Sequence, residues 1–245
     1  MRVGPSAAVL TACLVLAGAA SASASSTGDP RPPGRTQSST AALISDAPVY
    51  KHPGDAKQIR IASAVTSWTW SRTVLLVLRS ARDSRDRLWL KVLLPVRPNE
   101  SAGWILAQHA KLAVTRARVE ISLRARALRV RLGGRVAFKK SVVIGARATP
   151  TPRGLFAIYE RAESEPRAVI GPFALHLTAF SEVLHSYDGG PGRVAIHGRS
   201  GALLSDPLGS ASSHGCVRIN NSVLRRVAKY AKPGAPVSIT NGWPS

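Results

Sequence analysis

The stretch from residue 197 to residue 221 contains side chains that together could break an amide bond. Cys216 supplies a thiol, His214 precedes it by two residues, and His197 lies farther upstream. A thiol must lose its proton to become a strong nucleophile, and a neighbouring imidazole can take that proton near neutral pH. Glycines next to both histidines let backbone N–H groups approach a developing oxyanion. The pattern predicts acyl transfer by a cysteine nucleophile whose neighbours raise its thiolate fraction.

This stretch resembles the signature of the L,D-transpeptidase (YkuD) family, in which a histidine is followed, after a variable gap, by Ser/Thr-His-Gly-Cys. His197 is the first histidine here, residues 198–212 form the gap, and residues 213–216 read SHGC. The resemblance implies that Cys216 attacks the amide carbonyl and forms a thioester. It also implies that His197 is the base.

The resemblance implies roles for three neighbours of the nucleophile. The backbone N–H groups of His214 and Gly215, with that of Cys216, are expected to form the oxyanion hole, so these residues and His197 are the predicted catalytic set. Arg218 follows the nucleophile by two positions. Its forked donors could bind a substrate carboxylate, or they could hold the loop.

Two further residues are predicted to contribute to the substrate-binding side of the site together with Arg218. They are Gly198, whose carbonyl is expected to orient the His197 ring, and Ser213, which opens the SHGC motif. No nucleotide, phosphate-loop or other cofactor motif is present, so no cofactor and no metal are expected.

The substrate implied by the resemblance is the peptidoglycan stem peptide. A donor tetrapeptide would lose its terminal D-alanine, and the side-chain amine of a second stem would resolve the thioester and form a 3→3 cross-link. Water could resolve the thioester instead, which would make the protein an L,D-carboxypeptidase.

Alternatives from other classes remain open. The NlpC/P60 hydrolases place their cysteine before their histidine, and sortases place the histidine much farther from the cysteine. A metal site built from His197, His214 and Cys216 would need an unusually wide first spacing. A wall-binding protein without catalysis would tolerate Cys216→Ala.

The N-terminus predicts export. Residues 1–24 combine an early arginine, an apolar run and small residues suited to cleavage, as in a secretory signal peptide. Cys13 lies in a lipoprotein-like box, so lipid anchoring is an alternative. It is less favoured because apolar sequence continues past Cys13 and little precedes it. Cleavage would leave Cys216 as an unpaired cysteine in an oxidising compartment, where a reactive thiol is one explanation. We expect the protein at the cell wall or on the extracytoplasmic face of the membrane.

The formal net charge is +21, from 34 basic and 13 acidic residues. Because the chain is expected to be exported, we expect acidic wall polymers as partners and no nucleic acid; no basic run interleaved with aromatic residues indicates a nucleic-acid groove. No stable partner protein is implied.

The chain of 245 residues is predicted to be mostly β. A flexible linker is expected at 25–40, a small β domain at 41–112 and the catalytic domain at 114–241. Part of the β domain resembles the SH3-like module that precedes the catalytic domain of some actinobacterial L,D-transpeptidases. Its four tryptophans are expected mainly in the core. The resemblance implies a β-sandwich for the catalytic domain, with one or two helices.

Local patterns predict several elements of the catalytic domain. Alternating apolar residues change phase across 124–127, which indicates a hairpin, and Gly133-Gly134 indicates a second turn. A strand is expected to deliver His197. After Cys216, a helix capped by Asn221 or Ser222 should bury its apolar face, and 236–240 should form the last strand. The segment GARATPTPRGLFAIYE resembles the family's TP-x-G-x-F segment near the active site, and its residues indicate only a loop and then a strand.

Overall fold

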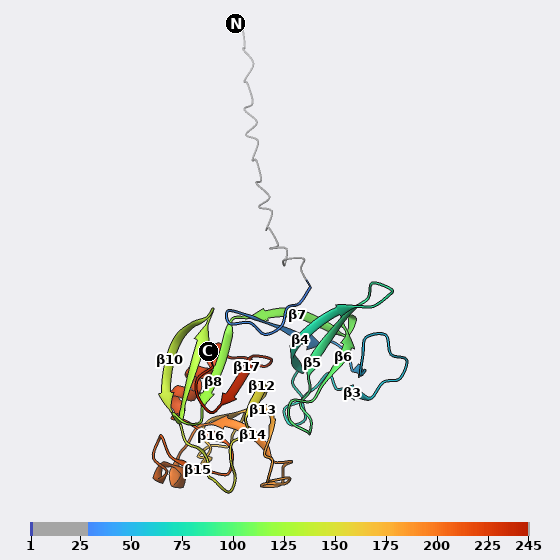
Figure 1. Cartoon of the computed structure of the whole chain (residues 1–245). Coiled ribbons are helices and arrows are strands. Elements are labelled where there is room, and N and C mark those ends of the chain that lie inside the picture. The colour runs from blue at the N-terminus through green and yellow to red at the C-terminus, as the bar shows by residue number, and fades with distance from the viewer. Residues whose placement is uncertain (2–28, 245) are drawn as a thin grey trace.

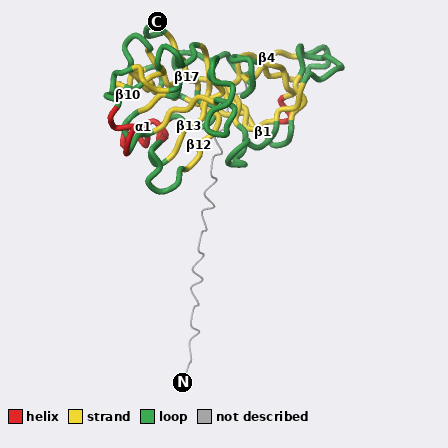
Figure 2. The backbone as a smooth tube through the Cα atoms, turned by 90° about the horizontal axis from the view of Figure 1, so that it is seen from below, coloured by secondary structure: helices red, strands yellow, loops and turns green. Residues whose placement is uncertain are grey.

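The computed structural model describes residue 1 and residues 29–244, and its strands form two main sheets that lie side by side (Figures 1 and 2). The predicted signal peptide and Cys13 lie outside the described residues. Among the described residues, no helix has the length and apolar character needed to span a bilayer. The prediction of a mostly β protein is confirmed.

The first sheet has five strands in the order β6-β5-β4-β1-β7. All neighbours in it run antiparallel. Its strands are β1 (Ser38–Leu43), β4 (Val74–Arg82), β5 (Leu88–Leu93), β6 (Ala102–Leu106) and β7 (Ala110–Thr115). A short pair, β2 (Ala47–Val49) with β3 (Arg60–Ala62), and a 3₁₀ turn at Ala107–His109 complete this part.

This sheet differs in two ways from the sequence-based expectation. Strand β1 begins at Ser38, before the predicted linker ends, because its serine and threonine residues pair through their backbones with β7 and need no apolar side chain to do so. Trp89 and Trp104 are buried as expected, whereas Trp68 and Trp70 are exposed. The SH3-like assignment of this part stays a prediction.

The second sheet has eight strands in the order β10-β9-β8-β17-β12-β13-β14-β16. It is mixed, since β17 pairs in parallel with β8 and β14 pairs in parallel with β16. Its strands are β8 (Ala117–Ser122), β9 (Ala127–Leu132), β10 (Arg135–Ser141), β12 (Gly154–Glu163), β13 (Phe173–Phe180), β14 (Arg193–His197), β16 (Val217–Arg218) and β17 (Pro236–Thr240). A small parallel pair, β11 (Ile144–Gly145) with β15 (Ala211–Ser213), and a 3₁₀ segment at Gly201–Ser205 lie beside it.

The two predicted hairpins are present. Strands β8 and β9 pair antiparallel with Val119 opposite Val130, so the apolar residues of both strands share one face. Gly133 and Gly134 both have positive φ, at 56° and 87°, which is the backbone of a tight turn whose twist matches the flanking strands. The turn leads into β10, which returns along β9.

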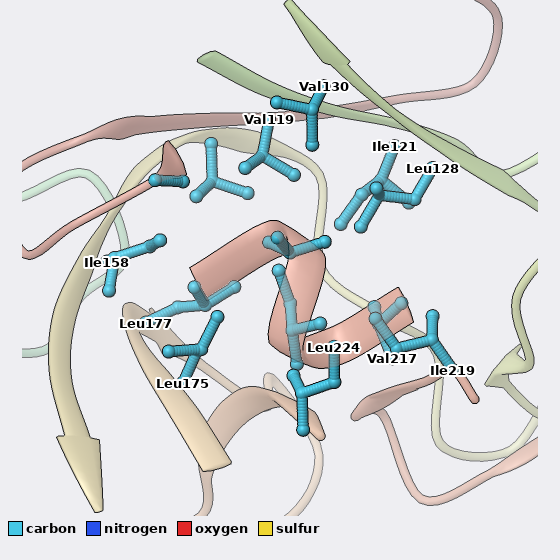
Figure 3. Close-up of a cluster of buried hydrophobic side chains, with 14 of the residues drawn as sticks. Val119, Ile121, Leu128, Val130, Ile158, Leu175, Leu177, Val217, Ile219 and Leu224 are labelled. Carbon is cyan, nitrogen blue, oxygen red and sulfur yellow. The ribbon is translucent and has the colours of Figure 1, made fainter. Parts of the chain in front are cut away.

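The one α-helix of the described residues is α1, Asn221–Tyr230; of its predicted apolar face, Leu224, Val227 and Ala228 are buried and Val223 is partly buried. The N-cap is Asn220, one residue before the predicted range, and its side chain makes no cap hydrogen bond. Side chains from both ends of the eight-stranded sheet pack around α1, which makes the β-sandwich core (Figure 3). The side chains labelled in this view come from β8, β9, β12 and β13, from β16 and the residue after it, and from α1. They are Val119, Ile121, Leu128, Val130, Ile158, Leu175, Leu177, Val217, Ile219 and Leu224.

The two sheets contact each other directly. A small buried cluster joins Leu76 and Leu93 of the first sheet to Ala157 of β12. The Asn99 side chain donates to the Phe180 carbonyl and accepts from the Phe180 N–H, each at 2.8 Å. The five-stranded part is therefore fixed against the edge of the sandwich that carries β13 and β14.

Candidate active site

Three neighbouring strands place the predicted site residues on one face of the sheet. In the antiparallel register of β13 and β14, His176 lies opposite Ala195. In the parallel register of β14 and β16, His197 lies opposite Arg218, and Cys216 directly precedes β16. Because side chains alternate between faces, His176, His197 and Arg218 point to the same side, together with Cys216 two residues before Arg218. All four line one cavity.

The residues between them point the other way and hold the strands in place. Leu175, Ile196 and Val217 are buried in the core around α1, and Figure 3 labels Leu175 and Val217 there. A change of register by one residue would send the site residues into the core and the core residues into the cavity. The apolar face of these strands thus fixes which side chains reach the cavity.

The His197 ring is held in one tautomer. Its Nδ1 lies 2.7 Å from the Gly198 carbonyl oxygen, and because a carbonyl only accepts, Nδ1 carries the proton. The lone pair of Nε2 is then free to accept a proton. Burial lowers the pKa of His197 to about 4, and the positive charge of Arg218 acts in the same direction. At neutral pH the ring is an uncharged base.

The structure corrects the expectation for the thiol. Burial raises the pKa of Cys216, and this exceeds the opposing effects of a hydrogen bond from the Ala195 backbone and of the Arg218 charge. Cys216 forms no disulfide within the described residues. At neutral pH the Cys216 thiol and the His197 imidazole are therefore both uncharged.

The turn before Cys216 is closed by Ser213. Its Oγ donates to the Cys216 carbonyl at 2.6 Å and accepts from the Gly215 N–H at 3.2 Å. The φ of Gly215 is 114°, a backbone conformation that favours glycine. Ser213, predicted to bind substrate, is buried inside the turn. Since the Gly215 N–H is engaged there, the N–H groups of His214 and Cys216 are the remaining candidates for an oxyanion hole.

Thr151 is a residue of this turn that sequence reasoning missed. Its buried Oγ1 donates to the Gly215 carbonyl and accepts from the Gly145 N–H, both at 2.8 Å. The Thr149 Oγ1 donates to the Ser213 carbonyl at 3.1 Å. The signal for Thr151 was the TP-x-G-x-F segment, which begins at this residue and whose pattern had indicated only a loop and a strand; Thr149 lies two positions before it.

His214 lies at the rim of the cavity. It is exposed, and its Nδ1 is 3.2 Å from the hydroxyl of Tyr187, which belongs to the loop between β13 and β14. The two rings are 5.2 Å apart and tilted by 32°. The side chain of His214 therefore joins the turn before Cys216 to this loop.

Arg218 is bound by an acidic partner that the sequence did not indicate. Its Nη1 donates to the Asp206 carboxylate, beyond the 3₁₀ segment, and its buried Nε has no hydrogen-bond partner within residues 29–244. The structure thus gives Arg218 a role in holding the loop, while its side chain still borders the cavity.

Gly198 contributes to the site through its backbone. Its carbonyl orients His197, and a Cβ at this position would overlap the Asn221 side-chain oxygen. That oxygen accepts the Arg199 N–H at 3.0 Å at the start of α1. The absence of a side chain at residue 198 lets the helix approach the base.

The cavity has a volume of about 460 Å³, which is enough for a peptide segment, and both apolar and polar groups line it. Within residues 29–244, no cluster of three histidine, cysteine or carboxylate side chains is arranged to hold a metal ion. One wall comes from outside the eight-stranded sheet, because Trp68 of the N-terminal part borders the cavity.

Comparison with known proteins decides the family. The model of the YkuD family, described as the L,D-transpeptidase catalytic domain, matches residues 116–239. This chain belongs to the YkuD family of L,D-transpeptidases. The match contains every predicted site residue and the whole of the eight-stranded sheet up to Ile239, and it excludes the five-stranded sheet.

Individual relatives are more distant. The YkuD protein of Bacillus licheniformis is 29% identical over 123 residues, which are 50% of this chain and 65% of that protein. The match thus spans slightly less than two thirds of the relative. The catalytic domain of the Enterococcus faecium L,D-transpeptidase is 21% identical, with a TM-score of 0.37 over 51% of this chain and 96% of that one. An L,D-transpeptidase from Mycobacterium smegmatis is 15% identical, with a TM-score of 0.42 over 79% of this chain and 99% of that one.

The family assignment therefore rests on the match to the family model, and the hydrogen bonds of the site show how this chain holds the predicted residues. L,D-transpeptidases are acyl-transferring enzymes that act on peptidoglycan stem peptides. In this YkuD-family member, the His197 ring is oriented by Gly198, and the turn before Cys216 is held by Ser213 and Thr151.

Proposed function

We propose that this protein is an L,D-transpeptidase that forms 3→3 peptidoglycan cross-links through a thioester on Cys216. The observation that carries the proposal is the bond from His197 Nδ1–H to the Gly198 carbonyl. It leaves Nε2 as a proton acceptor on the face of the sheet that also presents Cys216 to the cavity. This is the arrangement that a thiol with a raised pKa needs in order to react.

Acylation begins when the Cys216 sulfur attacks the carbonyl of the penultimate residue of a donor tetrapeptide. The S–C bond forms as the thiol proton passes to His197 Nε2. The backbone N–H groups of His214 and Cys216 stabilise the resulting oxyanion. The C–N bond then breaks, and the proton on Nε2 passes to the departing D-alanine nitrogen, which leaves a thioester and a neutral base.

Deacylation repeats these steps with a new nucleophile. The side-chain amine of an acceptor stem attacks the thioester carbonyl and gives a proton to His197 Nε2. The S–C bond breaks, and the Cys216 sulfur takes that proton back. Water in place of the amine would give a shortened tripeptide, and this L,D-carboxypeptidase activity is the second candidate function for the same site.

The surroundings in the cell form part of the proposal. The net charge of +21 suits a substrate and wall polymers that carry negative charge. We place the protein, after export, at the cell wall or the outer face of the membrane. Arg218, on the cavity wall, supplies a cation for a donor carboxylate.

The test is incubation of the protein with purified disaccharide-tetrapeptides, followed by mass analysis. Cross-linked dimers that have lost one alanine are the expected product, and the Cys216→Ala protein should form none. Tripeptide monomers alone would assign the hydrolytic alternative. Unchanged substrate with folded protein, or equal turnover by the Cys216→Ala protein, would overturn the cysteine mechanism.

A further inference from the structure

The cavity is completed by the N-terminal part of the chain. Trp68 lies in the connection between β3 and β4, outside the residues that match the family, and yet it lines the cavity that contains Cys216. We propose that Trp68 is a substrate-binding residue and that it contacts the stem peptide of the acyl donor. This inference rests on the proposed function.

Two anchors hold the loop that carries Trp68. On one side of it, the N–H and Oγ of Ser67 lie 3.1 and 3.2 Å from the Tyr159 hydroxyl. On the other side, the N–H and Oγ1 of Thr69 donate to one Glu160 carboxylate oxygen at 3.1 and 2.8 Å. Tyr159 and Glu160 are both buried, on strand β12 of the catalytic sheet. Hydrogen bonds to a buried carboxylate are among the stronger ones in proteins, so the loop is fixed on both sides of Trp68.

The indole is supported by the same sheet. Its ring lies 4.4 Å from the ring of His176, and the Arg193 guanidinium lies 5.6 Å from its centroid. Trp68 nevertheless stays 41% exposed, and it borders the cavity. A large apolar ring that is rigidly held and open to a cavity is a good contact surface, because it loses little conformational freedom when a ligand covers it.

The chemistry of the ring selects what it can bind. An indole face carries partial negative charge, so it disfavours carboxylates and favours C–H groups and the planes of amides. The donor's carboxylates therefore belong near Arg218, and its peptide backbone and aliphatic side chains belong against Trp68. The five-stranded part would thus act directly in substrate recognition.

Trp70 provides a matched control within the same loop. It is the same residue type two positions farther on, is 75% exposed and does not border the cavity. Tyr159→Phe provides a second variant, because it removes the hydroxyl that anchors Ser67 and keeps the aromatic ring. Trp68→Ala probes the contact itself, Trp70→Ala controls for changes to the loop, and Tyr159→Phe probes the positioning of the Trp68 ring.

The experiment measures binding of a purified disaccharide-tetrapeptide by calorimetry to the full chain carrying Cys216→Ala. Adding Trp68→Ala should weaken binding by roughly tenfold, Trp68→Phe and Tyr159→Phe should weaken it less, and Trp70→Ala should leave it unchanged. In chains that retain Cys216, Trp68→Ala should raise KM and leave the rate of Cys216 alkylation by iodoacetamide unchanged. Unfolding of the Trp68→Ala chain would move the decision to Trp68→Phe.

Each opposite result overturns the proposal. Binding within twofold of the parent in folded Trp68→Ala and Trp68→Phe chains would show that the ring makes no substrate contact. Equal weakening by Trp70→Ala would assign the effect to the loop in general, and slower alkylation would assign Trp68 to the structure of the site. Failure of the parent chain to bind the muropeptide would instead refute the proposed function, which keeps the two failures distinct.

Discussion

His197 and Arg218 are direct partners in the parallel register of β14 and β16. Burial and the positive charge of Arg218 together disfavour protonation of the His197 ring. Arg218 in turn is bound by Asp206. The site keeps its imidazole neutral and its cation paired before any substrate arrives.

Loss of the His197 imidazole should slow acylation strongly. We expect His197→Ala to slow acylation by a factor on the order of 10² or more, because the thiol of Cys216 then has no acceptor for its proton. His52→Ala, at an exposed histidine of the N-terminal part, should have no effect. In the His197→Ala protein, binding of the stem peptide, measured by calorimetry, should change much less than the rate of acylation. Near-normal acylation in His197→Ala would move the role to His214.

The nucleophile should be unique. Because the lactam carbonyl of a carbapenem mimics the scissile amide, we expect one adduct per mature chain, on the Cys216 peptide, as measured by mass spectrometry. Cys216→Ser should gain almost none, since a serine hydroxyl is far harder to deprotonate. A second adduct on Cys13 would contradict the predicted removal of the signal peptide, and folded protein without any adduct would contradict the assignment of Cys216.

The Arg218–Asp206 pair separates substrate binding from loop support. We expect Arg218→Ala to raise KM more than it lowers kcat, and Arg218→Lys to restore only part of the affinity, because lysine lacks the forked donors. Asp206→Asn leaves the cation in the cavity and weakens its link to the loop. If Asp206→Asn reproduces the kinetics of Arg218→Ala, the guanidinium acts on the loop and not on substrate.

The Thr151 hydroxyl should matter for both stability and rate. Thr151→Val keeps the shape and leaves the Gly145 N–H and the Gly215 carbonyl without their partner, which should lower the free energy of unfolding by about 1–3 kcal/mol. The loosened turn should also lower kcat. Thr151→Ser retains the hydroxyl and should recover most of both, as measured by urea unfolding and by acylation kinetics. Full activity in Thr151→Val would remove this residue from the machinery of the turn.

Two histidines, the buried His197 and the half-buried His176, should make the fold sensitive to acid. Burial lowers the pKa of His176 and of His197 from 6.5 to about 4. Between these values the unfolded chain binds a proton that the folded chain does not, so the free energy of unfolding falls as the pH falls, by at most about 1.4 kcal/mol per pH unit for each histidine. Urea unfolding between pH 7 and pH 4 measures the slope. His176→Gln should reduce it, and an unchanged slope would contradict the neutral state of His176.

The sequence predicted features that depend on neighbours along the chain. Phase changes in apolar residues predicted the β8–β9 hairpin, the apolar face of α1 was correct, and Pro236–Thr240 is the last strand. The SHGC motif was visible because its residues are contiguous. Local periodicity is a direct consequence of backbone geometry, so such features can be predicted without a structure.

Features made by distant segments could not be predicted in this way. Thr151 meets Gly215 across 64 positions, and Thr69 meets Glu160 across 91 positions. Nothing in the sequence distinguishes Asp206 from other loop carboxylates, and only the fold brings it to Arg218. Burial and charge at Cys216 likewise come from several strands together, which is why the raised pKa of its thiol differed from the expectation.

The position of β17 has a consequence for how the protein acquires its fold. This strand lies between β8 and β12, and Val237 pairs with Val119, so the middle of the sandwich is closed by almost the last residues described. Pairing across such a sequence distance carries a large loop-closure cost and makes folding slow. Until residue 240 has been synthesised, β8 and β12 both present open edges that favour association with other chains. A chaperone that shields these edges until β17 pairs should therefore raise the yield of folded protein.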